Sequence, residues 1–116
     1  FGDHTKDMLK VGGENVAASE IERVIQGVPD VHECAVIAQR HPMLEEVPVA
    51  FVRPAPGLAA EALATLPDRV AAACRAQLAD FKQPRGVRLV DDFPRSTLEK
   101  IAKAALREQL RRDEPA

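Results

Sequence analysis

Apolar residues recur along this chain with two different spacings, one typical of helices and one typical of strands. After Ser19 they stand at positions i, i+3, i+4 and i+7, as Ile21, Val24, Ile25 and Val28. This spacing predicts a helix with one apolar face, ended by the segment 27–29. Ser19 and Glu22 have the order of a capping box, so we expect both side chains to satisfy backbone N–H groups at the helix start.

Runs rich in branched apolar residues predict three strands, at residues 31–39, 47–53 and 87–90. Between the first two runs we expect residues 40–46 to form a charged loop. Pro48, near the start of the second run, suits an edge strand or a first strand position because it has no N–H to donate.

A second helix is predicted after the break at residues 54–57. A connection continues through Ala64, and the helix begins at about Thr65 with Asp68 in its first turn. Its inward-facing residues are Val70, Ala73, Cys74 and Leu78. Residues 81–85 end it.

The last helix is expected to begin at Leu98 or Lys100. Its narrow apolar face consists of Ile101, Ala104 and Ala105. Lys103, Arg107 and Arg111 recur at four-residue spacing, which indicates a solvated face on the same helix.

The N-terminal stretch predicts a small hairpin. Residues 8–11 form a short strand, Gly12 and Gly13 can adopt positive φ at the tip, and residues 15–16 resume an extended course. Helices and strands are therefore intermixed. The predicted fold is an α+β lobe, with this hairpin and a three-stranded, mainly antiparallel sheet flanked by about three helices.

Composition excludes several classes of function. With 116 residues and a net charge of -2, the chain is one domain and not a general nucleic-acid binder. Trp and Tyr are absent, so no aromatic platform stacks single-stranded bases. No apolar run approaches the ~20 residues that span a bilayer. We expect neither a nucleic-acid partner nor a membrane span.

Cysteine and histidine usage bears on compartment and metal binding. Cys34 and Cys74 are isolated in a predicted strand and helix, which favours a reduced, cytoplasmic protein over a disulfide scaffold. The histidines show none of the close spacings of metal ligands, so no metal site is expected in this chain.

Two motifs carry a resemblance that covers essentially the whole chain. The first is Asp3-His4-Thr5-Lys6-Asp7-Met8-Leu9-Lys10-Val11-Gly12-Gly13-Glu14-Asn15-Val16, followed by Glu20-Ile21-Glu22. It resembles the hinge and first loop of the C-terminal lobe of adenylate-forming enzymes, the acyl-CoA synthetase superfamily. The second is Phe93-Pro94-Arg95-Ser96-Thr97-Leu98-Glu99-Lys100-Ile101-Ala102-Lys103, which resembles that family's catalytic lysine segment.

The resemblance implies that residues 1–116 are the C-terminal lobe of an AMP-forming acyl-CoA ligase, with a hinge at about residues 3–7. Such an enzyme converts a carboxylic acid, ATP and coenzyme A to acyl-CoA, AMP and pyrophosphate. Its larger N-terminal adenylation lobe, which binds ATP with Mg and the acid, is absent from this chain. The chain opens on Phe1 rather than Met, so we interpret it as a fragment that is inactive alone.

Lys100 is the implied catalytic residue. Joining a carboxylate to the α-phosphate of ATP brings two anions together, and a mobile ammonium group stabilises the developing charge. Composition alone favours an ordinary helix lysine. Glu99 stands where the family commonly has glycine, which bears on the flexibility of the lysine loop.

The same resemblance assigns the hinge to Lys6 and Asp3, because the family rotates this lobe between its two half-reactions. His4 stands where the family commonly has an arginine and is expected near the nucleotide. A neutral imidazole cannot offer the bidentate fork of arginine, so this contact is expected to be weaker or pH-sensitive.

Residues of the hairpin are implied in thioester formation. Gly12 and Gly13 leave room for a thin pantetheine arm, and Lys10 and Glu14 belong to the same coenzyme A site. A purely structural turn, with Lys10 as a strand-edge charge, is the alternative. Candidate contacts to the coenzyme A phosphates are Lys82, Arg85 and Arg88, for which a solvated rim is the alternative.

Within the superfamily the motifs are nearest to fatty acid and crotonobetaine/carnitine-type CoA ligases. One alternative function is an adenylation-domain lobe that loads a carrier protein. Another, of a different class, is a freestanding interaction module without catalysis.

Overall fold

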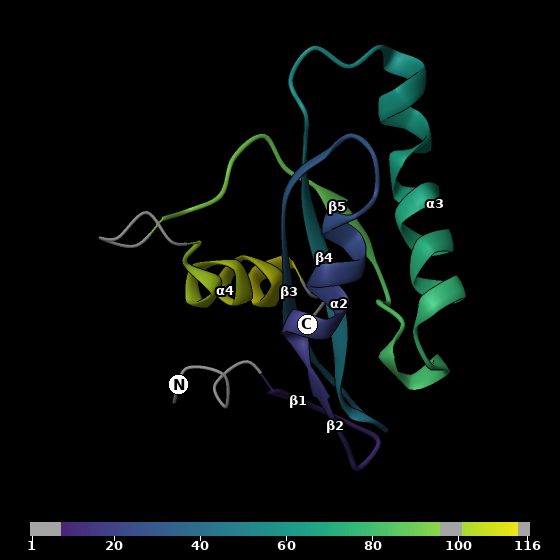
Figure 1. The fold of residues 1–116 in the computed structure, drawn as a ribbon. Helices are drawn as coiled ribbons and strands as arrows, with labels where there is room; N and C mark the ends of the chain where they lie inside the picture. Colours follow the sequence, from purple (N-terminus) through teal and green to yellow (C-terminus); the bar gives the residue numbers. More distant parts are fainter. Residues whose placement is uncertain (1–7, 96–100, 114–116) are drawn as a thin grey trace.

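A computed structural model of the chain describes residues 8–95 and 101–113. In chain order its elements are β1 (Met8–Val11), β2 (Glu14–Ala17), α2 (Ala18–Gln26), β3 (Val31–His41), β4 (Glu45–Pro54), α3 (Ala60–Gln77), the 3-10 turn η1 (Asp80–Lys82), β5 (Val87–Leu89) and α4 (Lys103–Asp113) (Figure 1). The predicted α+β class, the N-terminal hairpin and the three helices are confirmed.

The sheet is built on the long β3–β4 hairpin. Its antiparallel register sets Ala35 opposite Phe51 and Ile37 opposite Val49. β1 and β2 pair with each other, and β1 joins β4 where Val11 faces Glu45. β5 pairs with β4 in parallel, further along the strand. The N-terminal hairpin is therefore part of one five-stranded sheet rather than an addition to three strands.

Alternation along β3 and β4 separates two cores. Val36, Ala50 and Val52 face α2 and α3, where Ile21, Ile25, Leu66, Val70 and Cys74 complete a buried cluster. The intervening residues face α4, where Ala35, Ile37, Val49, Phe51, Phe93, Leu106 and Leu110 form a second cluster. The sheet is thus sandwiched between α2 with α3 on one face and α4 on the other (Figure 1).

The predicted loop 40–46 is wrong for most of its length. β3 continues to His41 and β4 begins at Glu45, so only residues 42–44 form the turn. His41 supports this turn because its Nδ1 accepts the N–H groups of Met43 and Leu44, each at 3.1 Å. Arg40 and Glu46 are paired in the antiparallel β3–β4 register, so both charged residues belong to strands rather than to a loop.

Pro48 fits β4 although β4 is a central strand. On the side of β4 away from β3, its carbonyl accepts the N–H of Arg85 at 2.8 Å. On that side Pro48 lies between the β1 pairing at Glu45 and the β5 pairing that begins at Ala50. The missing N–H therefore interrupts no strand ladder.

The capping box at Ser19 is also wrong. α2 begins at Ala18 and has no side-chain cap. The Glu22 carboxylate instead accepts the N–H of Val36 at 2.8 Å and pairs with the Lys103 ammonium at 2.7 Å. Because β3 lies at one edge of the sheet, this contact satisfies a backbone donor that would otherwise be open.

The starts of the later helices differ from the prediction. α3 begins at Ala60 rather than Thr65, because residues 60–63 are good helix formers and the interior Pro67 is tolerated. Its predicted inward face is confirmed, with Val70 and Cys74 fully buried.

α4 begins at Lys103, after Ile101 has formed a bridge with Arg95. Its buried residues are Leu106 and Leu110 rather than the predicted face of Ile101, Ala104 and Ala105. Lys103 is not solvated as predicted, since its side chain is 18% exposed.

Candidate functional site

The glycine hairpin has the geometry expected of a bare backbone tip. Gly12 has φ +56° and Gly13 has φ +89°, both in the region that disfavours residues with a Cβ. The Gly12 N–H donates to the Leu44 carbonyl at 2.8 Å, so the tip is attached to the β3–β4 turn. A methyl group added at Gly13 would meet no atom of the described residues within 4 Å.

A pocket of about 430 Å³ lies between this hairpin and the turn that follows α3. Its lining residues are Val11, Gly12, Glu14, Leu44, Asp80, Phe81 and Arg85. The fold thus brings Arg85, a predicted coenzyme A residue, beside two others, Gly12 and Glu14, that lie far from it in sequence. Phe81 adds an apolar surface that is 39% exposed and that sequence reasoning did not assign to the site.

The other predicted coenzyme A residues lie outside this pocket. Lys10 is exposed on β1, and its backbone N–H donates to Glu46 Oε1 at 2.9 Å. The Lys82 ammonium lies 2.9 Å from Glu20 Oε2 and 5.6 Å from the centre of the Phe81 ring. The Arg88 guanidinium lies 6.0 Å from the centre of the Phe51 ring.

Four predicted site residues, Asp3, His4, Lys6 and Lys100, lie outside the described residues. The chain on both sides of the lysine segment is described, however. Arg95 and Ile101 form an antiparallel bridge, and the Ala102 N–H donates to the Pro94 carbonyl at 2.7 Å. Lys100 is therefore one peptide unit from a residue whose place in the fold is fixed.

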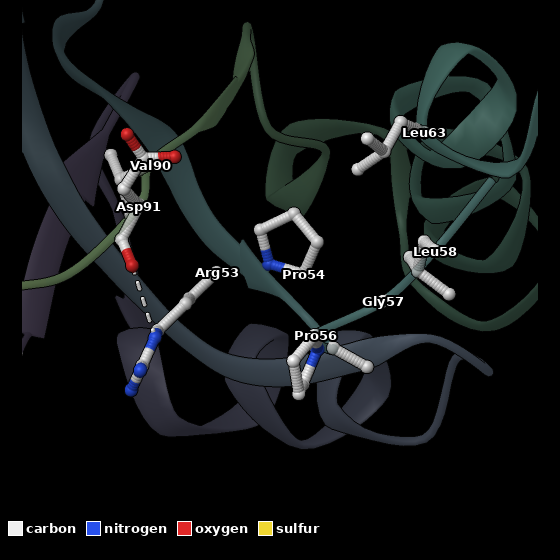
Figure 2. A pocket seen from close by; sticks show the side chains of 9 residues that line it. Arg53, Pro54, Pro56, Gly57, Leu58, Leu63, Val90 and Asp91 are labelled. Atoms are coloured by element: carbon white, nitrogen blue, oxygen red, sulfur yellow. Dashed lines mark hydrogen bonds between the residues drawn. The ribbon is translucent and has the colours of Figure 1, made fainter. Parts of the chain in front are cut away.

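A second pocket, of about 290 Å³, lies where β4 leaves the sheet. Figure 2 shows its lining, which consists of residues 53–58 with Leu63, Val90 and Asp91. Sequence reasoning predicted no site residue here. Arg53, at one wall, donates from Nε to the Asp91 carbonyl at 3.1 Å.

Neither thiol of the described chain is activated. Cys34 and Cys74 form no disulfide. Burial raises the pKa of Cys34 to about 12, with a further increase from the nearby Glu22 carboxylate, and burial also raises the pKa of Cys74. Both groups are therefore protonated near neutral pH and are poor nucleophiles.

The described residues contain no cluster of three His, Cys, Asp or Glu side chains suited to a metal ion. Among the same residues, no helix is both long enough and apolar enough to cross a bilayer.

Residues 20–100 match the family model of the AMP-binding enzyme C-terminal domain. The chain is 39% identical over 101 residues to the 4-chlorobenzoate--CoA ligase of Pseudomonas sp. (strain CBS-3), covering 86% of this chain and 18% of that protein. Among solved structures, it is similar to a Mycobacterium tuberculosis fatty acyl CoA synthetase (TM-score 0.80, 37% identity, 95% of this chain and 21% of that one). It is also similar to MatB from Rhodopseudomonas palustris (TM-score 0.80, 38% identity, 90% of this chain and 20% of that one). The chain thus spans about a fifth of the length of these relatives.

Proposed function

Because the chain belongs to the AMP-binding enzyme C-terminal domain family, we propose that residues 1–116 are the C-terminal lobe of an AMP-forming acyl-CoA ligase. The complete enzyme would first join a carboxylic acid to ATP, releasing pyrophosphate, and would then transfer the acyl group to the thiol of coenzyme A, releasing AMP. Its partner would be an N-terminal adenylation lobe of the same protein, which would hold ATP, Mg²⁺ and the acid. We propose a cytoplasmic location because the cysteines at 34 and 74 are free thiols.

One observation supports this proposal most strongly: the glycine tip and Arg95, the described residue that leads into the lysine segment, lie at opposite ends of the β3–β4 hairpin. The glycine tip contacts the turn at Leu44, beside His41 at the end of β3. The base of the lysine segment contacts Glu33, near the start of β3, through Arg95. The eight residue steps from Glu33 to His41 span about 26 Å of strand. A single orientation of the lobe cannot present both ends to one reaction centre, whereas two orientations can.

In the first orientation, Lys100 would act on the adenylation step. Its ammonium group would lie between the attacking carboxylate and the α-phosphate, where it stabilises the negative charge of the transition state. Loss of one such contact typically costs about 3–4 kcal/mol in activation free energy.

In the second orientation, the pocket beside Gly12 and Gly13 would receive coenzyme A. The bare tip leaves space for the pantetheine arm, and Glu14 and Lys10 lie on the same hairpin. Arg85 is the leading candidate for a phosphate contact because it lines the pocket, with Lys82 and Arg88 nearby in sequence. Coenzyme A would supply the nucleophilic thiol, and this chain would supply the passage to it.

Rotation between the orientations would take place at Lys6 and Asp3, where a few backbone torsions absorb the movement. His4 would lie near the nucleotide.

The test is an assay of the complete protein with ATP, Mg²⁺, a panel of carboxylic acids and two acceptors. We expect AMP and a thioester to form with free coenzyme A, and only when an acid is present. Transfer to a phosphopantetheinylated carrier protein but not to free coenzyme A would replace this function with carrier loading. Failure to exchange pyrophosphate into ATP with any acid would contradict an adenylate-forming activity.

A further inference from the structure

An ion-pair cluster that the sequence motifs did not reveal lies at the base of the lysine segment. It consists of Glu33 on β3, Arg53 on β4, and Asp92 and Arg95 in the segment that follows β5. Arg95 donates to both oxygens of Glu33, from Nη2 to Oε1 at 2.6 Å and from Nη1 to Oε2 at 3.1 Å. Arg53 Nη1 donates to the same Glu33 Oε1 at 2.9 Å.

At the centre of the cluster, Glu33 and Arg95 meet through side chains that are only partly exposed. The Glu33 and Arg95 side chains are 26% and 29% exposed, and their planar groups meet in the two-bond arrangement that a guanidinium favours with a carboxylate. The nearby Arg95 and Arg53 guanidinium groups lower the pKa of Glu33, so this carboxylate is ionised at neutral pH.

Further contacts fix the chain that leads into Arg95. Arg53 Nε donates to the Asp91 carbonyl, as Figure 2 shows, and the Asp92 carboxylate accepts the Phe93 N–H at 2.8 Å. Phe93 itself is buried at 4% exposure in the core beneath α4. Residues 91–95 are therefore held to the end of the sheet by their backbone, one apolar side chain and one guanidinium.

The guanidinium contact bears on Lys100 through the bridge between Arg95 and Ile101. That bridge joins the chain entering the lysine segment to the chain leaving it, and Lys100 directly precedes Ile101. Glu33 thus holds Arg95, Arg95 lies opposite Ile101, and Ile101 is covalently next to Lys100.

We propose that Arg95, oriented by Glu33, is a positioning residue for Lys100 in the adenylation step. This inference rests on the proposed function, in which Lys100 is the catalytic group. Arg95 touches neither substrate nor ATP in this account; it sets where the Lys100 ammonium can reach. A misplacement of about 1 Å can cost on the order of 100-fold in rate, so the effect on turnover can be large even where the fold persists.

The experiment uses the complete protein and three substitutions in this cluster. Arg95→Gln removes the positive charge, and Glu33→Gln removes the negative charge of its partner. Arg95→Lys keeps the positive charge but cannot form the pair of parallel hydrogen bonds that the guanidinium makes. We expect the first two to lower kcat of acyl-adenylate formation by about 10- to 100-fold, with KM for ATP within about twofold of wild type. Thioester formation from supplied acyl-adenylate should be unchanged, and Arg95→Lys should recover part of the lost kcat.

The double variant Glu33→Gln/Arg95→Gln decides whether the two residues act together. We expect its kcat to be no lower than that of the more affected single variant, since both substitutions break the same contact. Losses that multiply would contradict the assigned relation between Glu33 and Arg95.

The matched control is Arg111→Gln, the same chemical change at an exposed ion pair with Glu108 on α4. It should leave both half-reactions at the wild-type rate. Equal losses in both half-reactions for Arg95→Gln, or an adenylation rate like that of the control, would overturn the positioning role. Lys100→Ala is measured in parallel: if it retains adenylation, the catalytic role that the proposed function gives to Lys100 fails, whereas if it loses adenylation while Arg95→Gln does not, only the positioning role fails.

Discussion

Substituting alanine for Gly13 distinguishes two possible roles of this glycine. One is to adopt the positive φ of the hairpin turn, and the other is to leave open space for the pantetheine arm of coenzyme A. Gly13 has φ +89°, and an added methyl group would meet no described atom within 4 Å. Within this chain, the substitution therefore adds backbone strain and no collision. A left-handed conformation costs a residue with a Cβ about 1–2 kcal/mol.

Gly57 provides a matched control. It has φ +79°, an added methyl group there would also meet no described atom within 4 Å, and it lies in the connection before α3 rather than in the hairpin. Both variants of the chain should therefore unfold at temperatures lower by about 5–15 °C, at roughly 4–8 °C for each kcal/mol in a domain of this size. Gly12→Ala belongs to the same series, with an additional contact at 3.3 Å to Leu44 Cδ2.

The functional measurement follows both half-reactions in the complete protein. The Gly13→Ala methyl group is expected to collide with a bound pantetheine arm, at a steric cost of about 1–3 kcal/mol. A cost of that size would slow thioester formation by about 10- to 100-fold. Adenylation should remain within about twofold of the Gly57→Ala value. Equal thioester rates in Gly13→Ala and Gly57→Ala would refute the requirement for space and leave the glycines with a turn-forming role only.

Two further predictions concern the hinge and pH. Lys6→Pro, which restricts the backbone at the proposed hinge, should preserve adenylation and slow thioester formation in stopped-flow assays; equal loss of both rates would contradict a rotation there. Because Arg95 and Arg53 lower the pKa of Glu33 from its ordinary value, the stabilising contribution of Glu33 should be complete above that ordinary value and lost as pH falls through the lower, folded-state value. In urea titrations, the stability difference between wild type and Glu33→Gln should therefore shrink on acidification, and a constant difference down to pH 3 would contradict this.

Local patterns predicted the α+β class, the strands β3 and β4 and the buried face of α2 well. The helical spacing of Ile21 and Ile25 reflects the core between α2 and the sheet, and the branched apolar runs reflect strands that are buried on both faces. The capping-box prediction failed because the sequence does not reveal the partners that Glu22 has in the folded chain. Its carboxylate accepts the N–H of Val36 on β3 and pairs with the Lys103 ammonium. Competition between a local and a distant partner is decided by tertiary structure.

The same limit applies to the candidate sites. The glycine pair and the lysine segment are continuous motifs, and they could be recognised from the sequence. The contact of Arg95 with Glu33 joins residues 62 positions apart, and the pocket lined by Gly12 and Arg85 depends on where the turn after α3 meets the hairpin. Neither leaves a periodic signal in the chain.

The most direct test is the rate of acyl-adenylate formation by the complete protein when Lys100 is replaced by alanine. We expect this rate to fall on the order of 100- to 1000-fold, as for other single groups that stabilise transition-state charge. Thioester formation should continue at nearly the wild-type rate when the acyl-adenylate is supplied. Adenylation that continues undiminished without this ammonium group would contradict the catalytic role of Lys100.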